Sequence, residues 1–236
     1  MIQISDVHKK FGRNEVLKGL DLSIGKGGII AVLGPNGSGK TTLIKSILGM
    51  VLVDRGKITV LDRSVKTHWD YRKEINYLPQ IANFPGNLRV KELMEMIMDL
   101  RQKPANASEL IERFGLGPHL DKKLSTLSGG TKQKVNLVLA FMFDSPLIIL
   151  DEPTTGLDPA ALIQLKKLLD GEREKGKTIL ISSHILQFVE EMADEIVYLL
   201  EGKIYFKGPI KALKEKTGQN DFEHAIAAIA LQEDHA

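Results

Sequence analysis

A glycine-rich segment at residues 34–41 constrains this chain more than any other stretch. It follows an apolar run at residues 29–33 that is typical of a buried strand, and it precedes apolar residues at helical spacing. The segment consists of Gly34, Pro35, Asn36, Gly37, Ser38, Gly39, Lys40 and Thr41. A strand, a glycine-rich turn, a lysine, a hydroxyl and a helix, in this order, predict a phosphate-binding loop.

Each residue type in this loop has a chemical role in binding phosphate. Glycine adopts positive φ without strain, so the backbone can turn successive N–H groups toward one point. The helix that follows directs the positive end of its dipole to the same point. We expect Lys40 to reach the β- and γ-phosphates and the Thr41 hydroxyl to bind Mg²⁺. The loop therefore predicts a site for a nucleoside triphosphate with Mg²⁺.

Length, charge and composition limit the kinds of protein that this chain can be. The 236 residues can bury the core of one α/β domain with an inserted subdomain. A net charge of +2 does not indicate a nucleic-acid partner, and the absence of cysteine excludes disulfides and thiolate metal sites. We expect no signal peptide, and no apolar run approaches the roughly 18 residues of a membrane span. If the protein acts at a membrane, another chain must cross it.

The apolar pattern predicts an α/β fold with a mostly parallel sheet. Strands are expected at residues 2–8, 16–24, 29–33, 57–61, 75–78, 147–150, 178–182 and 195–200. The first two, with a turn between them, predict an antiparallel β subdomain at the N-terminus. Helices at 160–175 and 186–192 alternate with the later strands, so both faces of the sheet are expected to be covered.

A helical segment interrupts this alternation. From about residue 87 to 143 the pattern is mostly helical, with no convincing strand. We therefore expect a single domain, residues 1–236, that is divided into three parts. They are a core at about 1–84 and 144–208, a helical subdomain at about 85–143, and a helical tail at about 209–236.

Two further segments carry candidate chemistry. Asp151 and Glu152 end an apolar strand, where an aspartate of a P-loop hydrolase holds Mg²⁺ and a neighbouring carboxylate can address a water molecule. Ser128, Gly129 and Gly130 precede a long apolar helix, where Ser128 is a good N-cap and the glycines leave N–H groups open. Taken alone, this second segment is better explained as a capped helix start.

Three segments, in their order along the chain, resemble the ATP-binding cassette of ABC proteins. They are the loop at residues 34–41, the segment at 127–130 and the strand end at 147–152. The segment at 127–130 resembles the signature sequence of that family, which other P-loop ATPases lack. The resemblance covers about residues 1–208, nearly the whole chain.

Single residues extend the resemblance. Residues 155–158 resemble the D-loop of the family, His184 its switch histidine, and Gln80 the glutamine of its Q-loop. Phe11 stands where the family places the aromatic ring that stacks on adenine, although tyrosine is commoner there. The signature departs from the family at Thr131, where glutamine is usual.

The resemblance implies which residues hold the nucleotide. Lys40, Thr42 and the N–H groups of the loop would hold the phosphates of ATP, with Phe11 stacked on the base. Thr41, Gln80 and Asp151 would organise Mg²⁺.

It also implies the catalytic residues and a shared site. Glu152 would be the base for the attacking water, and His184 would contact the γ-phosphate. Ser128 and the N–H groups of residues 129–130 would contact the γ-phosphate that the opposite subunit binds, and Asp158 would cross the interface. We therefore expect a head-to-tail dimer, a homodimer or a paired cassette, that holds two ATP molecules.

The function that this resemblance implies is the ATP-hydrolysing subunit of a transporter, on the cytoplasmic face of the cell membrane. Separate transmembrane permease subunits would dock near residues 81–88. An alternative is a soluble ABC ATPase without a transport role, such as an iron–sulfur assembly ATPase. A GTP-binding switch is disfavoured because the chain lacks a guanine-reading motif. The short tail resembles exporter-type cassettes, and segments 128–143 and 184–207 resemble the ATPase subunit of a copper-processing transporter linked to nitrous-oxide reductase maturation.

Overall fold

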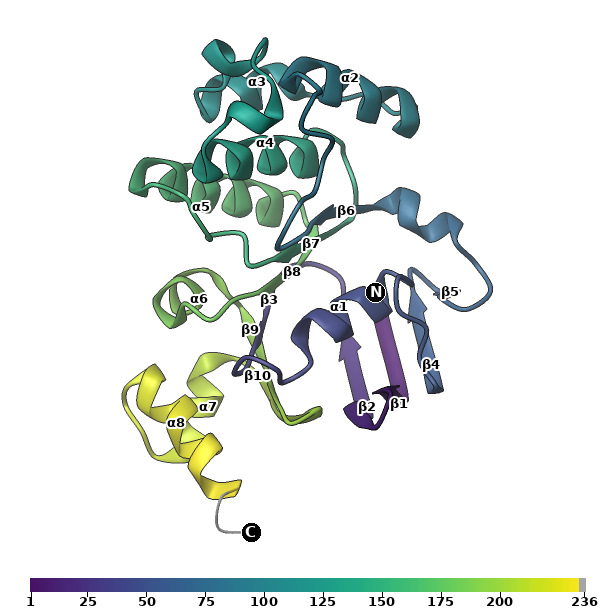
Figure 1. Ribbon diagram of the computed structural model, residues 1–236. Helices are drawn as coiled ribbons and strands as arrows, with labels where there is room; N and C mark the ends of the chain where they lie inside the picture. The colour runs from purple at the N-terminus through teal and green to yellow at the C-terminus, as the bar shows by residue number, and fades with distance from the viewer. Residues whose placement is uncertain (234–236) are drawn as a thin grey trace.

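Two β-sheets organise the protein in this computed structural model, which describes residues 1–233 (Figure 1). The smaller sheet is antiparallel and has the strand order β2-β1-β4-β5. Its strands are β1 (Ile2–Phe11), β2 (Asn14–Ile24), β4 (Arg55–Val60) and β5 (Arg63–Ser64). This sheet is the antiparallel N-terminal element that the sequence predicted.

The larger sheet has the order β10-β9-β3-β8-β7-β6, and all its neighbouring strands are parallel except β10 and β9. Its strands are β3 (Gly28–Leu33), β6 (Ile75–Leu78), β7 (Leu147–Asp151), β8 (Thr178–Ser182), β9 (Glu195–Leu200) and β10 (Lys203–Gly208). Every residue of β7 and β8 is buried, as expected for strands whose two faces are both covered.

One helix packs between the two sheets. Helix α1 (Lys40–Ile47) lies beside the larger sheet and above β1 and β2 in the view of Figure 1. Its buried Leu43, Ile44 and Ile47 join one hydrophobic cluster with residues of both sheets, such as Leu17 and Val32. The antiparallel sheet is therefore held to the parallel sheet through the helix that follows the glycine-rich loop.

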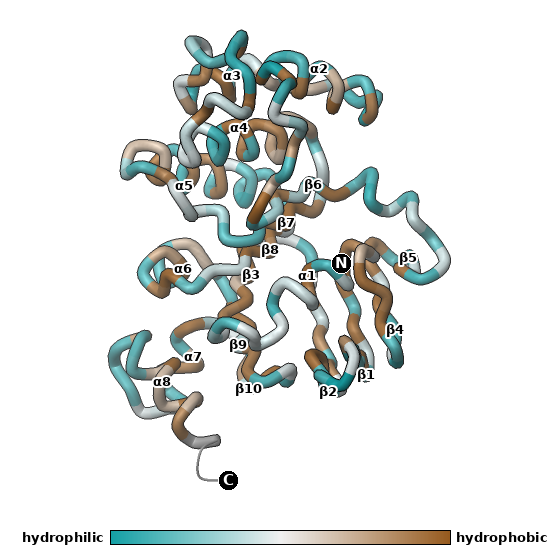
Figure 2. The backbone as a smooth tube through the Cα atoms, viewed as in Figure 1, coloured by the Kyte–Doolittle hydropathy of each residue, from teal (hydrophilic) through white to brown (hydrophobic). Residues whose placement is uncertain are grey.

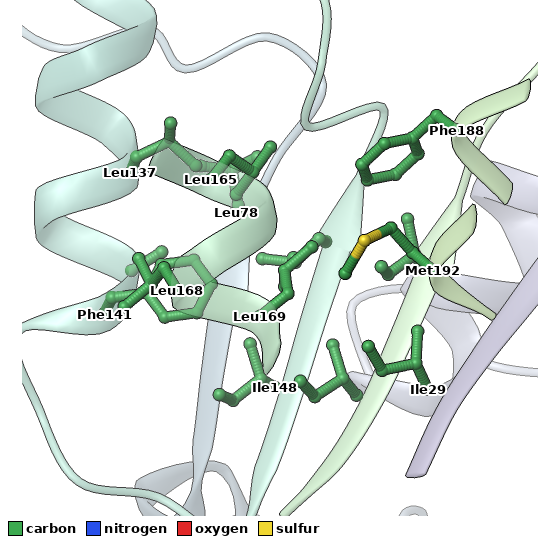
Figure 3. Packing of buried hydrophobic residues seen from close by; sticks show 14 of the residues in the cluster. Ile29, Leu78, Leu137, Phe141, Ile148, Leu165, Leu168, Leu169, Phe188 and Met192 are labelled. Atoms are coloured by element: carbon green, nitrogen blue, oxygen red, sulfur yellow. The ribbon is translucent and has the colours of Figure 1, made fainter. Parts of the chain in front are cut away.

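Three helices cover the opposite face of the larger sheet. They are α4 (Gly129–Phe141), α5 (Pro159–Glu174) and α6 (Leu186–Met192). Leu137 of α4, Leu169 of α5, Met192 of α6 and Ile148 of the sheet belong to one hydrophobic cluster, part of which Figure 3 shows. Full burial of one such aliphatic side chain contributes about 1.5–3 kcal/mol. Hydrophobic colour accordingly concentrates on β7, β8 and α4 in Figure 2.

The segment between β6 and β7 is helical, as predicted. It contains α2 (Val90–Arg101), α3 (Ala107–Arg113), α4 and the short 3₁₀ turns Gly117–His119 and Leu124–Thr126. A further 3₁₀ turn, Asp70–Glu74, precedes β6. The division into core, helical subdomain and tail at about residues 84, 143 and 208 stays a prediction.

The structure differs from the sequence interpretation mainly at β5 and β10, which were not predicted. In β10 only Phe206 is buried, so the strand lacks the alternating pattern that marks a half-buried strand. A turn at Glu201 and Gly202, both with positive φ, directs the chain back along β9. Strand β4 begins at Arg55 and ends at Val60, slightly earlier than expected.

The chain ends in two predicted helices, α7 (Ile210–Thr217) and α8 (Phe222–Glu233). Phe222, Ala225 and Ile229 of α8 are buried in the large cluster, so this helix is docked on the protein. Residues 234–236 of the predicted tail lie outside the described residues. No helix within residues 1–233 is long and apolar enough to cross a membrane.

Candidate functional site

The loop at residues 34–41 connects the end of β3 to the start of α1. Gly39 has a φ of 107° and stands directly before α1, a conformation that is strained for any other residue. Gly34 has no room for a side chain, because a Cβ there would lie 2.0 Å from the backbone oxygen of Leu199. The predicted phosphate-binding loop therefore depends on glycine for its conformation and for its packing against β9.

Lys40 is buried inside this loop. Its Nζ donates hydrogen bonds to the backbone oxygens of Gly34 at 2.7 Å and Pro35 at 3.0 Å. Burial lowers the pKa of Lys40, and the nearby charges of Glu152 and Asp151 act in the opposite direction. A phosphate anion bound in the loop would offset this cost of burying the ammonium group.

Asp151 ends β7 and has one carboxylate oxygen without a partner. The side chain is buried, with 2% of the residue exposed. Its Oδ1 accepts a hydrogen bond from the Ser182 hydroxyl, whereas its Oδ2 has no hydrogen-bond partner. An unpaired buried carboxylate oxygen is costly, and it is the ligand type that Mg²⁺ prefers. Asp151 therefore fits the predicted metal site.

Glu152 follows Asp151 where the chain leaves the sheet. It has a φ of 52°, uncommon for a residue with a side chain, and is only 6% exposed. Its Oε2 lies 2.8 Å from Nδ1 of His184, which donates because a carboxylate has no proton to give. The structure thus brings together two of the predicted catalytic residues, which are 32 positions apart in the sequence.

A cavity of about 350 Å³ is lined by half of the predicted site residues. Its lining residues come from the glycine-rich loop, the strand ends at Gln80 and Asp151, and strand β2. They are Asn14, Val16, Asn36, Gly37, Gly39, Lys40, Thr41, Thr42, Gln80, Asp151 and Glu152. Sequence reasoning did not identify Asn14 and Val16. Both lie at the start of β2, directly after the turn that follows Phe11, and this position could have indicated that they line the site.

Phe11 lies at the end of β1 and is not among the lining residues. Its side chain is half exposed, which argues against a packed core residue. Phe11 is paired in the sheet with Asn14, which does line the cavity. The Lys9 ammonium lies 5.3 Å from the centre of the Phe11 ring. The ring is therefore accessible near one side of the cavity.

Ser128, Gly129, Gly130 and Asp158 lie at the starts of two helices. They do not line the cavity, and neither do the predicted residues Gly34, Pro35, Ser38 and His184. Ser128 caps α4 by accepting a hydrogen bond from the Thr131 backbone N–H at 3.3 Å. Its Oγ also lies 2.9 Å from the Thr131 hydroxyl, a contact that exists because threonine occupies this position. Asp158 caps α5 through the Ala161 N–H at 2.8 Å, and it pairs with Lys134 at 2.6 Å.

The start of α4 packs closely on the loop that follows Glu152. A Cβ on Gly130 would lie 2.7 Å from the backbone oxygen of Gly156, whereas a Cβ on Gly129 would meet nothing within 4 Å. Gln133 donates a hydrogen bond to the backbone oxygen of Pro153 at 3.1 Å. Within one chain, Ser128, Gly129, Gly130 and Asp158 therefore form a group apart from the residues that line the cavity.

Comparison with known proteins agrees with this geometry. The family model described as ABC transporter matches residues 17–155. The chain is 35% identical over 228 residues to the Nod factor export ATP-binding protein I of Bradyrhizobium sp. (strain SNU001), covering 94% of this chain and 75% of that protein.

Two solved structures are similar along most of the chain. The ATP-binding subunit of an ABC transporter superposes with a TM-score of 0.91 at 28% identity, covering 98% of this chain and 99% of the other. A dimeric post-hydrolysis state of an ATP-binding cassette, bound to ADP and Pi, superposes with a TM-score of 0.77 at 25% identity, covering 89% and 98%.

Proposed function

The chain belongs to the ABC transporter family, and from this premise we propose how its own residues bind and hydrolyse ATP. It is an ATP-binding and ATP-hydrolysing subunit, a cassette that works as a dimer on two ATP molecules. One observation carries the assignment of the site. The cavity of about 350 Å³ unites the glycine-rich loop, Gln80 and both strand-end carboxylates.

The loop and the strand ends hold the substrate. Lys40 leaves its own backbone acceptors and pairs with the β- and γ-phosphates, while the loop N–H groups and Thr42 contact the other phosphate oxygens. Thr41, Gln80 and Asp151 hold Mg²⁺, which when bound neutralises charge on the phosphates. The exposed ring of Phe11 stacks on adenine.

Glu152 accepts the proton of the attacking water. Its carboxylate lies at the cavity wall, and His184 donates to one of its oxygens, which fixes the direction of the other. The same His184 contacts the γ-phosphate. Ser128 and the Gly129–Gly130 amides, which do not line this cavity, act on the nucleotide of a second, head-to-tail subunit, with Asp158 at the interface.

Separate permease subunits dock beside Gln80. Ile81 is 74% exposed, and next to it a cavity of about 120 Å³ is lined by residues of the 82–86 segment and of α4. The subunit thereby sits on the cytoplasmic face of the membrane. A transport role is favoured over an iron–sulfur assembly role, because the relative matched along 94% of this chain is named as an export subunit. The copper-processing resemblance stays a prediction.

Crosslinking tests this docking site. The chain has no cysteine, so Ile81→Cys introduces one reactive thiol at the proposed contact. The matched control is Leu231→Cys on α8, where the leucine is 61% exposed. In native membranes we expect Ile81→Cys to crosslink to a polytopic membrane protein and Leu231→Cys not to do so. An adduct formed equally by both variants, or only with water-soluble proteins, would contradict the proposal.

A further inference from the structure

Ser182 contacts both carboxylate residues of the site, although no motif singled it out. It ends β8, is completely buried, and lies opposite Asp151 in the parallel pairing of β7 and β8. We propose that Ser182 is a positioning residue that sets Asp151 for the cation and Glu152 for the water. This inference rests on the proposed function of those two carboxylates.

The first contact selects one oxygen of Asp151. The Ser182 hydroxyl donates its single proton to Oδ1, so Oδ2 is the oxygen left without a partner. A hydrogen bond to an ionised group is stronger than one between neutral groups. The bond therefore fixes the rotation of the Asp151 carboxylate and leaves Oδ2 as the oxygen that would meet a bound cation. Without the hydroxyl, the carboxylate is free to turn.

The second contact holds Glu152 in its uncommon conformation. The Glu152 N–H lies 3.1 Å from the backbone oxygen of Ser182 and 3.1 Å from its Oγ, so both accept from one donor. This three-centre bond fixes the turn at which Glu152 adopts a φ of 52°. Such a conformation persists only where its surroundings hold it. The conformation of this turn determines where the Glu152 carboxylate meets His184.

One oxygen atom therefore couples the two roles. The Ser182 Oγ accepts from the backbone of Glu152 and donates to the side chain of Asp151. A serine that only filled space in a buried strand would make neither contact. The same strand offers a matched comparison: Thr178 is also completely buried, and its hydroxyl accepts from the Gly27 N–H at 2.8 Å, far from the carboxylates.

The test compares Ser182→Ala and Ser182→Thr with Thr178→Val. For Ser182→Ala we expect unchanged ATP affinity in EDTA, measured with a fluorescent ATP analogue. We expect a roughly five-fold or greater rise in the Mg²⁺ concentration that half-saturates ATP-driven dimerisation, and a fall in kcat of roughly ten-fold or more with little change in KM. Ser182→Thr, which keeps the hydroxyl, should restore both values, and Thr178→Val should leave both unchanged.

Several outcomes overturn the inference. One is a Ser182→Ala protein with the wild-type Mg²⁺ requirement and the wild-type kcat. Another is a Thr178→Val protein that loses as much as Ser182→Ala. The third is a Ser182→Ala protein that binds ATP more weakly than the wild type in EDTA. If Ser182→Ala does not fold, Ser182→Cys replaces it, because a thiol is a weak donor; the same shifts are expected, and unchanged values overturn the inference. Wild-type turnover in Glu152→Gln contradicts the proposed function instead, so the two failures are distinguishable.

Discussion

Nδ1 of His184 lies 2.8 Å from Oε2 of Glu152, and the two side chains differ sharply in exposure: 64% for the histidine and 7% for the glutamate. The pair joins the buried carboxylate at the end of β7 to an accessible imidazole that follows β8. The imidazole therefore restricts the rotation of the buried carboxylate while remaining accessible itself. This geometry underlies the first prediction.

Glu152→Gln is expected to bind ATP normally and to lose most of its turnover. The amide keeps the shape of the side chain but cannot accept a proton, and general-base catalysis contributes roughly 10²–10⁴-fold. ATP-bound dimer should accumulate, as measured by light scattering alongside phosphate release. Glu95→Gln, on the exposed side of α2, is the control. Turnover at the wild-type rate would remove Glu152 from the role of base.

Lys40→Ala is expected to lose most of the affinity for ATP. The lysine supplies the positive charge inside the loop, and its hydrogen bonds to Gly34 and Pro35 show that the ammonium already lies there. Equilibrium binding of a fluorescent ATP analogue measures the loss, with Lys45→Ala at the far end of α1 as the control. Unchanged binding in Lys40→Ala would count against the phosphate-binding loop.

Mixing two inactive variants tests the shared site. Lys40→Ala removes the phosphate-binding half, and Ser128→Arg blocks the half at the start of α4. In a head-to-tail heterodimer one site carries both changes and the other carries neither, so about one working site per heterodimer should recover. Phosphate release from the mixture, compared with each variant alone, is the measurement. A mixture without any recovery would refute sharing.

Gly130→Ala is expected to disturb the protein more than Gly129→Ala. The added methyl group at Gly130 would lie 2.7 Å from the backbone oxygen of Gly156, so the loop after Glu152 must shift. At Gly129 the same methyl group meets open space in one chain. Chemical denaturation of the nucleotide-free protein should show a lower midpoint only for Gly130→Ala. Equal midpoints for Gly130→Ala and Gly129→Ala would mean that the loop after Glu152 can shift without loss of stability.

The ionisation of the Asp158 carboxyl group should make the stability of the folded protein depend on pH in the acidic range. Hydrogen bonds from Lys134 and from the Ala161 N–H lower its pKa from 3.8. Because the folded pKa lies below the unfolded one, this stabilisation is present above pH 3.8 and is lost as the pH falls through the folded pKa. Asp158→Asn keeps the helix cap, so its stability should depend less on pH in the acidic range. Asp158→Ala also loses the cap and should therefore unfold more easily at pH 7.

Denaturation midpoints measured from pH 7 downward separate these effects. The wild-type protein should lose more stability on acidification than Asp158→Asn. Parallel curves for the two proteins would show that the carboxylate charge at this position does not contribute to the folded state.

Elements whose signals are local could be predicted from the amino-acid sequence. The glycine-rich loop predicts its own strand, turn and helix, because positive φ at Gly39 and the apolar spacing of α1 are properties of neighbouring residues. Uninterrupted apolar runs likewise identified β7 and β8 as buried strands. Strand β10 was missed because it depends on pairing with β9, which its own pattern does not record.

Contacts between residues far apart in the sequence could not be predicted in this way, because they depend on how the strands and helices pack. Lys40, Gln80 and Asp151 line one cavity because parallel strands present their carboxyl ends at the same edge of the sheet. The contact of Ser182 with Asp151 exists because β7 and β8 pair in that register. A buried serine in a strand has the same local pattern whichever residue it faces. The physical reason is that register and strand order arise from packing between distant segments, whereas secondary structure depends largely on residues close in the chain.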